Sequence, residues 1–177
     1  HLSIRRQRQM CIRDRSKVNS WEEFPAAVDL ALEDDEKILV EPEIVGQEVE
    51  IGVLHYADGT LLASVPALLA GIDDSDEGFY GFDTKYLDNV VTAEIPAPFT
   101  PELTEKLRDM AVRAFEALNC EGLSRVDFFV TEDSVYINEI NTLPGFTPIS
   151  MYPQVLAASG VEYPALLEAL IEQALAK

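Results

Sequence analysis

Apolar and polar residues alternate along several short stretches of the chain, and this period of two predicts β-strands. The longest alternating stretch covers residues 46–54, and two more strands flank an acidic turn between residues 123 and 141. Shorter strands are expected at residues 37–41, 60–67 and 92–98. Several of these strands are joined by turn residues, as in a sheet of mainly antiparallel strands.

Four other stretches repeat their apolar residues every three or four positions, which predicts amphipathic helices. They cover residues 20–33, 101–118, 151–158 and 163–176. Ser20 is the expected N-cap of the first helix, and Thr100, followed by a proline, is the expected N-cap of the second. The sequence therefore predicts an α+β fold, in which helices pack on a mainly antiparallel sheet.

Most of the candidate chemistry lies between Leu123 and Gly145. Side chains two positions apart on a strand share a face, so Arg125 and Asp127 point the same way, as do Glu139 and Asn141. If the two strands are joined by a three-residue loop, Asp127 lies opposite Glu139 and Arg125 lies opposite Asn141.

Two facing carboxylates repel each other unless a cation lies between them. Oxygen ligands of this kind suit Mg²⁺, which takes one or two carboxylates and completes its shell with phosphate oxygens and water. Arg125, beside the same spot, could hold an anionic reacting group. On spacing alone the alternative is a solvated strand end that carries charges.

The net charge of −19 argues against nucleic acid and against an anionic membrane surface as partners. No apolar run approaches the ~20 residues of a membrane helix, and the N-terminus has no apolar signal-peptide core. Cys11 and Cys120 are too few for a disulfide framework or a zinc site. We therefore expect a cytoplasmic protein.

The first 15 residues differ in charge from the rest of the chain. They carry five arginines against one acidic residue, a charge of +4, which leaves −23 on the remainder. We expect residues 1–15 to be a non-native or disordered segment and residues 16–177 to form one domain. A basic arm that binds nucleic acid is the alternative interpretation of such a run.

Three longer patterns resemble those of one family. R-V-D-F-F at residues 125–129, followed by N-E-I-N-T-L-P-G-F-T at 138–147, resembles the metal-binding signature of the D-alanine–D-alanine ligases, members of the ATP-grasp superfamily. E-P-E-I-V-G-Q-E at residues 41–48 resembles their adenine- and ribose-binding segment. F-Y-G-F-D-T-K-Y at residues 79–86 resembles the mobile loop that closes over nucleotide and substrate. The likeness extends over residues 16–177.

The resemblance implies a role for individual residues. It implies an Mg²⁺ (or Mn²⁺) ion on Asp127, Glu139 and Asn141. The residues it implies for ATP are Glu41, Ile44, Glu48, Phe79, Lys85 and Phe129. Those it implies for the second amino acid are Tyr86, Ser150 and Met151. Those it implies for catalysis are Arg125, Lys85 and the backbone of Gly145.

The function that the resemblance implies is ATP-dependent joining of two D-alanines through an acyl phosphate, for peptidoglycan precursor synthesis. It also implies a homodimer for the complete enzyme. Tyr86, in the pair K-Y, resembles the ligases that use an amine, so the resemblance implies D-alanine rather than D-lactate as acceptor. Another ATP-grasp carboxylate–amine ligase and a non-catalytic nucleotide-binding module are the alternatives. The family's N-terminal domain and glycine-rich loop have no counterpart in the sequence, so we expect the chain as given not to be a working ligase.

Overall fold

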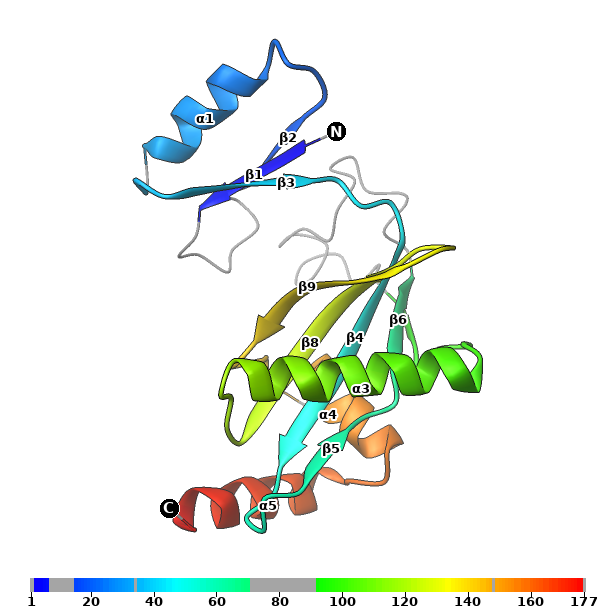
Figure 1. The fold of residues 1–177 in the computed structure, drawn as a ribbon. Helices are drawn as coiled ribbons and strands as arrows, with labels where there is room; N and C mark the ends of the chain where they lie inside the picture. Colours follow the sequence, from blue (N-terminus) through cyan, green and yellow to red (C-terminus); the bar gives the residue numbers. More distant parts are fainter. Residues whose placement is uncertain (1, 7–14, 34, 71–91, 148, 177) are drawn as a thin grey trace. The chain divides into compact units, whose positions relative to one another are not determined.

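The structure is a computed structural model, and two compact units can be distinguished in it (Figure 1). It describes residues 2–6, 15–33, 35–70, 92–147 and 149–176. One unit comprises residues 1–45 and 71–91, and the other comprises residues 46–70 and 92–177. The sequence predicts one domain over residues 16–177, and these domain boundaries stay a prediction.

The described part of the first unit is a small antiparallel sheet with a helix. The strand order is β2 (Arg15–Val18), β1 (Leu2–Arg6) and β3 (Ile38–Pro42). Helix α1 (Phe24–Leu32) buries Ala27 and Ala31 in a cluster with Val18. Strand β1 lies within residues 1–15, and the expectation that these residues are a non-native or disordered segment stays a prediction.

Helix α1 begins at Phe24, later than the expected start at Ser20. Residues 20–23 form a turn, and Glu23 is the N-cap residue. The carboxylate of Glu23 accepts a hydrogen bond from the backbone N–H of Asn19 at 2.8 Å. Pro25 then lies in the first helical turn, where its missing N–H has no cost.

The second unit carries the larger sheet, and its strands are antiparallel. The strand order is β7 (Thr92–Glu94), β6 (Ala67–Ala70), β4 (Gln47–His55), β8 (Leu123–Val130) and β9 (Val135–Asn141), and β5 (Leu61–Ala63) also pairs with β4. Its helices are α3 (Pro101–Ala117), α4 (Met151–Ala158) and α5 (Tyr163–Leu175). The predicted α+β fold with a mainly antiparallel sheet is confirmed.

The strand expected at residues 60–67 is two strands instead. The chain leaves β5 at Ala63 and joins β6 at Ala67, and both strands pair with β4. Ser64 fills the break, because its Oγ accepts a hydrogen bond from Gly52 N–H at 2.9 Å and donates one to Val65 O at 2.8 Å. The side chain thus replaces a backbone partner where the ladder is interrupted.

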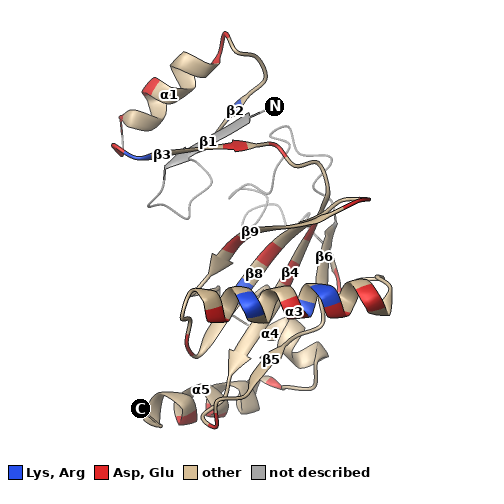
Figure 2. Ribbon diagram, in the orientation of Figure 1, with Lys and Arg blue, Asp and Glu red and all other residues tan. Residues whose placement is uncertain are grey.

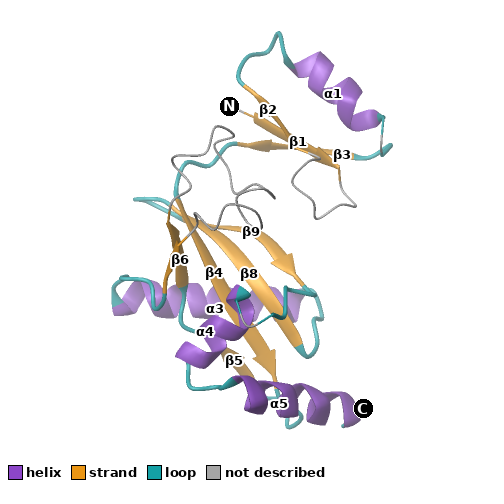
Figure 3. Cartoon of the chain, turned by 180° about the vertical axis from the view of Figure 1, so that it is seen from behind, coloured by secondary structure: helices purple, strands orange, loops and turns teal. Residues whose placement is uncertain are grey.

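The helices of this unit cover the two faces of the sheet (Figures 1 and 3). Helix α3 covers one face, and its buried Leu107, Ala111 and Phe115 pack on the alternate residues of β4 and β8. The sheet residues in this cluster are Val49, Ile51, Val53, Val126, Phe128 and Val130. Helices α4 and α5 lie on the opposite face. Within the described residues, each helix is too short or insufficiently apolar to cross a membrane.

Gly52 allows helix α4 to lie close against β4. A Cβ at Gly52 would come 2.5 Å from Leu156 Cδ2 and 3.1 Å from the ring of Tyr152. Tyr152 is fully buried, and its hydroxyl donates a hydrogen bond to Val53 O at 3.1 Å. Burial, assisted by the charge of Tyr56, raises the pKa of Tyr152, so the hydroxyl keeps the proton that it donates.

We expect Gly52→Ala to lower the free energy of unfolding by ~1–3 kcal/mol, because the added methyl overpacks a filled contact. Urea denaturation of the 177-residue chain measures this cost. Leu156→Ala removes one of the clashing atoms, so the double variant should lose less stability than the two single variants together. Fully additive costs would contradict the close packing described for α4.

Candidate functional site

The pairing of β8 with β9 brings four candidate residues onto one patch of the sheet. Asp127 lies opposite Glu139, and Arg125 lies opposite Asn141, as the sequence predicts. The three-residue loop assumed for this pairing is not present, however. Val130 pairs with Val135, so the loop has four residues, 131–134.

A β-bulge restores the predicted partners. The register shifts between Asp127 and Phe128, because Phe128 pairs with Ile137 whereas Asp127 pairs with Glu139. Asn138 is therefore the extra residue of β9. Bulges commonly occur beside functional sites, where they re-aim side chains. Here the bulge is what brings Glu139 opposite Asp127.

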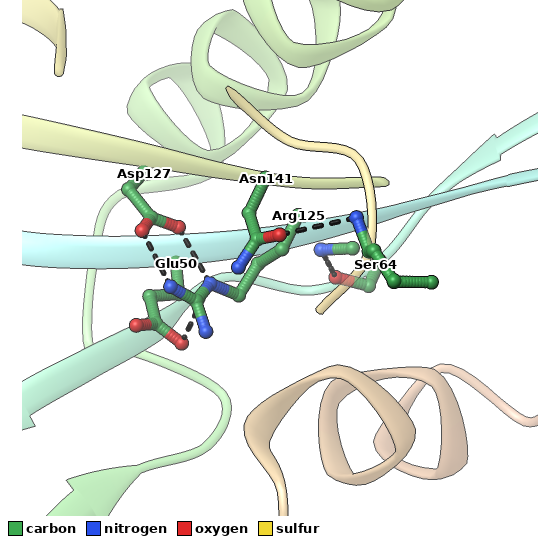
Figure 4. Close-up of polar contacts among 7 residues, drawn as sticks. Glu50, Ser64, Arg125, Asp127 and Asn141 are labelled. Atoms are coloured by element: carbon green, nitrogen blue, oxygen red, sulfur yellow. Dashed lines mark hydrogen bonds and ion pairs between the residues drawn. The ribbon is translucent and has the colours of Figure 1, made fainter. Parts of the chain in front are cut away.

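The guanidinium of Arg125 lies between two carboxylates (Figure 4). It donates to both oxygens of Asp127, from Nε to Oδ1 at 2.7 Å and from Nη2 to Oδ2 at 2.6 Å. Its Nε also lies 3.3 Å from Oε2 of Glu50, on the neighbouring strand β4. Arg125 is 9% exposed and Glu50 is 4% exposed, so this ion-pair cluster is buried.

The environment of Arg125 keeps it fully charged. Burial by itself would lower its pKa, but the hydrogen bond and the charge of Asp127, with the charges of Glu50 and Glu139, outweigh burial and raise the pKa. A permanently cationic, planar group with several N–H donors suits the binding of a carboxylate or a phosphate.

Asn141 joins the strand to the loop that follows it. It is buried, and its Oδ1 accepts a hydrogen bond from Leu143 N–H at 3.1 Å. This side-chain bond starts the turn after β9. The amide oxygen keeps a second lone pair, so the same atom retains the capacity to bind a cation.

The predicted substrate residues Gly145, Ser150 and Met151 lie in and after this loop. Ser150 is the N-cap residue of α4, yet its Oγ makes no capping bond and instead accepts from Thr147 N–H at 3.0 Å. A Cβ at Gly145 would come 3.0 Å from that oxygen. Met151 packs against the buried cluster around Tyr152 and Leu156. The absence of a side chain at Gly145 therefore leaves space for the Ser150 hydroxyl, which Thr147 holds in place.

The predicted nucleotide residues are distributed over different parts of the chain. Glu48 of β4 lies opposite Phe129 of β8, and both are half-buried. Glu41 and Ile44 are half-buried residues of the first unit, which is described by itself. The other candidates, Phe79, Lys85 and Tyr86, lie outside the described residues.

The oxygen atoms offered by β8 and β9 are of the chemical type that a small divalent cation binds. Across the part of the chain that the structure describes, no group of three or more His, Cys, Asp or Glu residues is arranged to hold a metal ion. Asp127, Glu139 and Asn141 offer two carboxylates and one amide oxygen. This set suits an ion that takes few protein ligands and fills its shell with phosphate oxygens and water, as Mg²⁺ does.

Sequence reasoning missed Glu50. The signal that could have found it is its place in the alternating strand of residues 47–55, where it shares a face with Glu48 and alternates with Val49 and Ile51. Acidic positions on β4, β8 and β9 are visible in Figure 2. Glu50 pairs directly with Asp127 across β4 and β8.

The antiparallel sheet, its covering helices and the polar patch on β4, β8 and β9 define an α+β domain of the ATP-grasp type. The chain belongs to the family described as D-ala D-ala ligase C-terminus, whose model matches residues 15–172.

Similar proteins carry the corresponding name. The D-alanine–D-alanine ligase from Corynebacterium efficiens is 64% identical over 160 residues, which are 90% of this chain and 44% of that protein. The structure of the D-alanine–D-alanine ligase from Coxiella burnetii has a TM-score of 0.82 and 34% identity, covering 98% of this chain and 44% of that one. The structure of the D-Ala:D-Ser ligase from Enterococcus faecalis has a TM-score of 0.79 and 30% identity, covering 97% of this chain and 49% of that one. The chain spans less than half the length of each of these proteins.

We expect Arg125→Met to lower the free energy of unfolding by ~3–5 kcal/mol, because it leaves the buried Glu50 and the partly buried Asp127 without their cation. Chemical denaturation of the 177-residue chain measures this loss. Arg113→Met is the matched control, since its side chain is 73% exposed and lies 3.6 Å from Asp109. The control should cost about 1 kcal/mol or less. Equal costs for the two variants would contradict the buried ion pair.

Proposed function

We propose that this chain supplies one half of the active site of an ATP-dependent ligase that joins two D-alanines for peptidoglycan precursor synthesis in the cytoplasm. The complete enzyme would act as a homodimer. The observation that carries the proposal is the polar patch in which Arg125 is held by Asp127 and Glu50, opposite Glu139 and Asn141. The alternatives are another ATP-grasp carboxylate–amine ligase and a non-catalytic nucleotide-binding module.

In the proposed reaction the γ-phosphoryl group of ATP passes to the carboxylate of one D-alanine. The amine of a second D-alanine attacks the resulting acyl phosphate, and inorganic phosphate leaves as the peptide bond forms. Arg125, buried and permanently charged, would bind the oxygen that becomes negative in the tetrahedral intermediate. Backbone N–H groups near Gly145 would donate to the same oxygen.

Asp127, Glu139 and Asn141 would hold an Mg²⁺ ion, which would neutralise the phosphate charge during transfer. Glu48 would accept hydrogen bonds from the ribose hydroxyls, because a carboxylate offers two acceptor oxygens. Phe129, opposite Glu48, would contact the nucleotide from the next strand. Glu41 and Ile44 would meet the adenine edge through their backbone.

The remaining roles rest on resemblance of sequence. Lys85 would reach the terminal phosphates of ATP, and Phe79 would pack near the adenine. Tyr86, Ser150 and Met151 would line the subsite of the second amino acid. The Ser150 hydroxyl, positioned by Thr147, would bind the carboxylate of that amino acid.

A chimera tests the proposal in a complete protein. Residues 15–172 would replace the matching part of the Corynebacterium efficiens ligase, which is 64% identical to this chain over 160 residues. We expect phosphate release that requires D-alanine, Mg²⁺ and ATP, with D-alanyl-D-alanine identified by mass spectrometry. The unmodified relative is the positive control. D-Serine and D-lactate, offered in competition, test the expected preference for D-alanine.

A folded chimera without amino-acid-dependent phosphate release would contradict the proposal. Binding of ATP alone would instead favour a non-catalytic nucleotide-binding module. Phosphate release with other carboxylate and amine substrates, and not with D-alanine, would favour a different ATP-grasp ligase.

In the active chimera, Asp127→Asn and Glu139→Gln should each raise the Mg²⁺ concentration needed for half-maximal turnover. Each removes a charged ligand, so an increase of about tenfold or more is expected, since even second-shell changes weaken metal affinity 10–100-fold. The matched controls are Asp133→Asn and Glu132→Gln, which make the same changes in the exposed loop of the same hairpin. An unchanged Mg²⁺ requirement in both site variants would exclude the assigned ligands.

A further inference from the structure

Glu50 is a buried carboxylate in the interior of the sheet. It lies on β4, where it pairs with Ala67 of β6 on one side and Asp127 of β8 on the other. Burial of a carboxylate is costly unless charged or hydrogen-bonding groups compensate it. The Arg125 guanidinium, 3.3 Å from Oε2 of Glu50, is one group that compensates it.

The two carboxylates contact Arg125 in different ways. Asp127 accepts two short, parallel hydrogen bonds, the geometry in which arginine and a carboxylate interact most strongly. Glu50 approaches from the adjacent strand, at a longer distance. The Glu50 side chain is 5% exposed and that of Asp127 is 13% exposed, so Glu50 lies deeper in the protein.

A cation on Asp127 would compete with Arg125. Both oxygens of Asp127 already accept hydrogen bonds from the guanidinium, and a divalent ion at the same carboxylate would repel that positive charge. Arg125 would then need a second anionic partner to remain beside the reacting group. Glu50 is already within ion-pair distance.

We propose that Glu50 is a positioning residue for Arg125. Glu50 keeps the guanidinium in the site when the Asp127 carboxylate binds a divalent cation instead of the guanidinium. This inference rests on the proposed function, because that function requires the cation at Asp127. Glu50 contacts neither the metal nor the substrate in this scheme. It acts through Arg125, whose N–H groups are freed from Asp127 and become available to an anionic reacting group.

Asp127→Asn imitates the loss of negative charge at Asp127 without any metal. In the ¹⁵N-labelled 177-residue chain, NMR follows the Nε–H signal of Arg125 and its exchange with solvent. We expect this proton to stay protected in Asp127→Asn, because Glu50 retains the guanidinium. Adding Glu50→Gln should speed its exchange by about tenfold or more, the equilibrium effect of losing a charge-assisted hydrogen bond.

A matched control separates position from charge. Asp127→Asn combined with Glu48→Gln also removes one negative charge from the same face of β4, two residues away and opposite Phe129. Exchange at Arg125 should then match that of Asp127→Asn alone. If the variant with Glu50→Gln does not fold, Glu50→Asp in the same background keeps the charge and shortens its reach, and it too should speed exchange.

Addition of Mg²⁺ to the wild-type chain and to Glu50→Gln tests the link to the cation. The Arg125 signal should shift but stay protected in the wild type, and it should lose protection in Glu50→Gln. A wild-type Arg125 signal that Mg²⁺ leaves unchanged would contradict the metal site, and with it the proposed function. Equal exchange rates of the Arg125 Nε–H in Asp127→Asn and in its double variants at Glu50 would overturn only the role proposed for Glu50.

Discussion

The Arg125 guanidinium is the group on which the polar face of the sheet depends. Three adjacent strands contribute acidic residues to this face, and their carboxylates would repel one another if no cation lay between them. Arg125 binds Asp127 through two hydrogen bonds and reaches Glu50 on the next strand. Because the guanidinium cannot lose its proton in the physiological range, the positive charge at the centre of this arrangement is permanent.

The packing of the sheet determines where that charge can lie. Helix α3 covers one face with apolar side chains, which leaves the polar side chains of β4, β8 and β9 on the other. On that second face α4 is held close to β4 by Gly52 and Tyr152. The loop before α4 therefore starts from a fixed strand end and finishes at a fixed helix. Gly145 in this loop leaves space for the Ser150 hydroxyl, since a Cβ at Gly145 would come 3.0 Å from it.

Sequence reasoning located the helices, most strands and the facing pairs of the hairpin, because period and turn residues are local signals. The pairing of Asp127 with Glu139 was derived by assuming a three-residue loop, whereas the loop has four residues. The pairing holds because the bulge at Asn138 shifts the register by one residue. Bulges depend on the twist and packing of neighbouring strands, which no local pattern encodes. Glu50 was missed for a similar reason, since its importance comes from β8, which is far away in the sequence.

The buried position of the cluster also explains why its charges interact strongly. In water an arginine and a carboxylate attract each other weakly, whereas at the low exposure of Arg125 and Glu50 the same charges interact strongly. A buried cation with more than one carboxylate partner can change partners without entering water. The sheet thus holds Arg125 in a place where a change of charge at Asp127 redirects its hydrogen bonds, and a charge on the exposed surface of α3 could not do this because water would screen it.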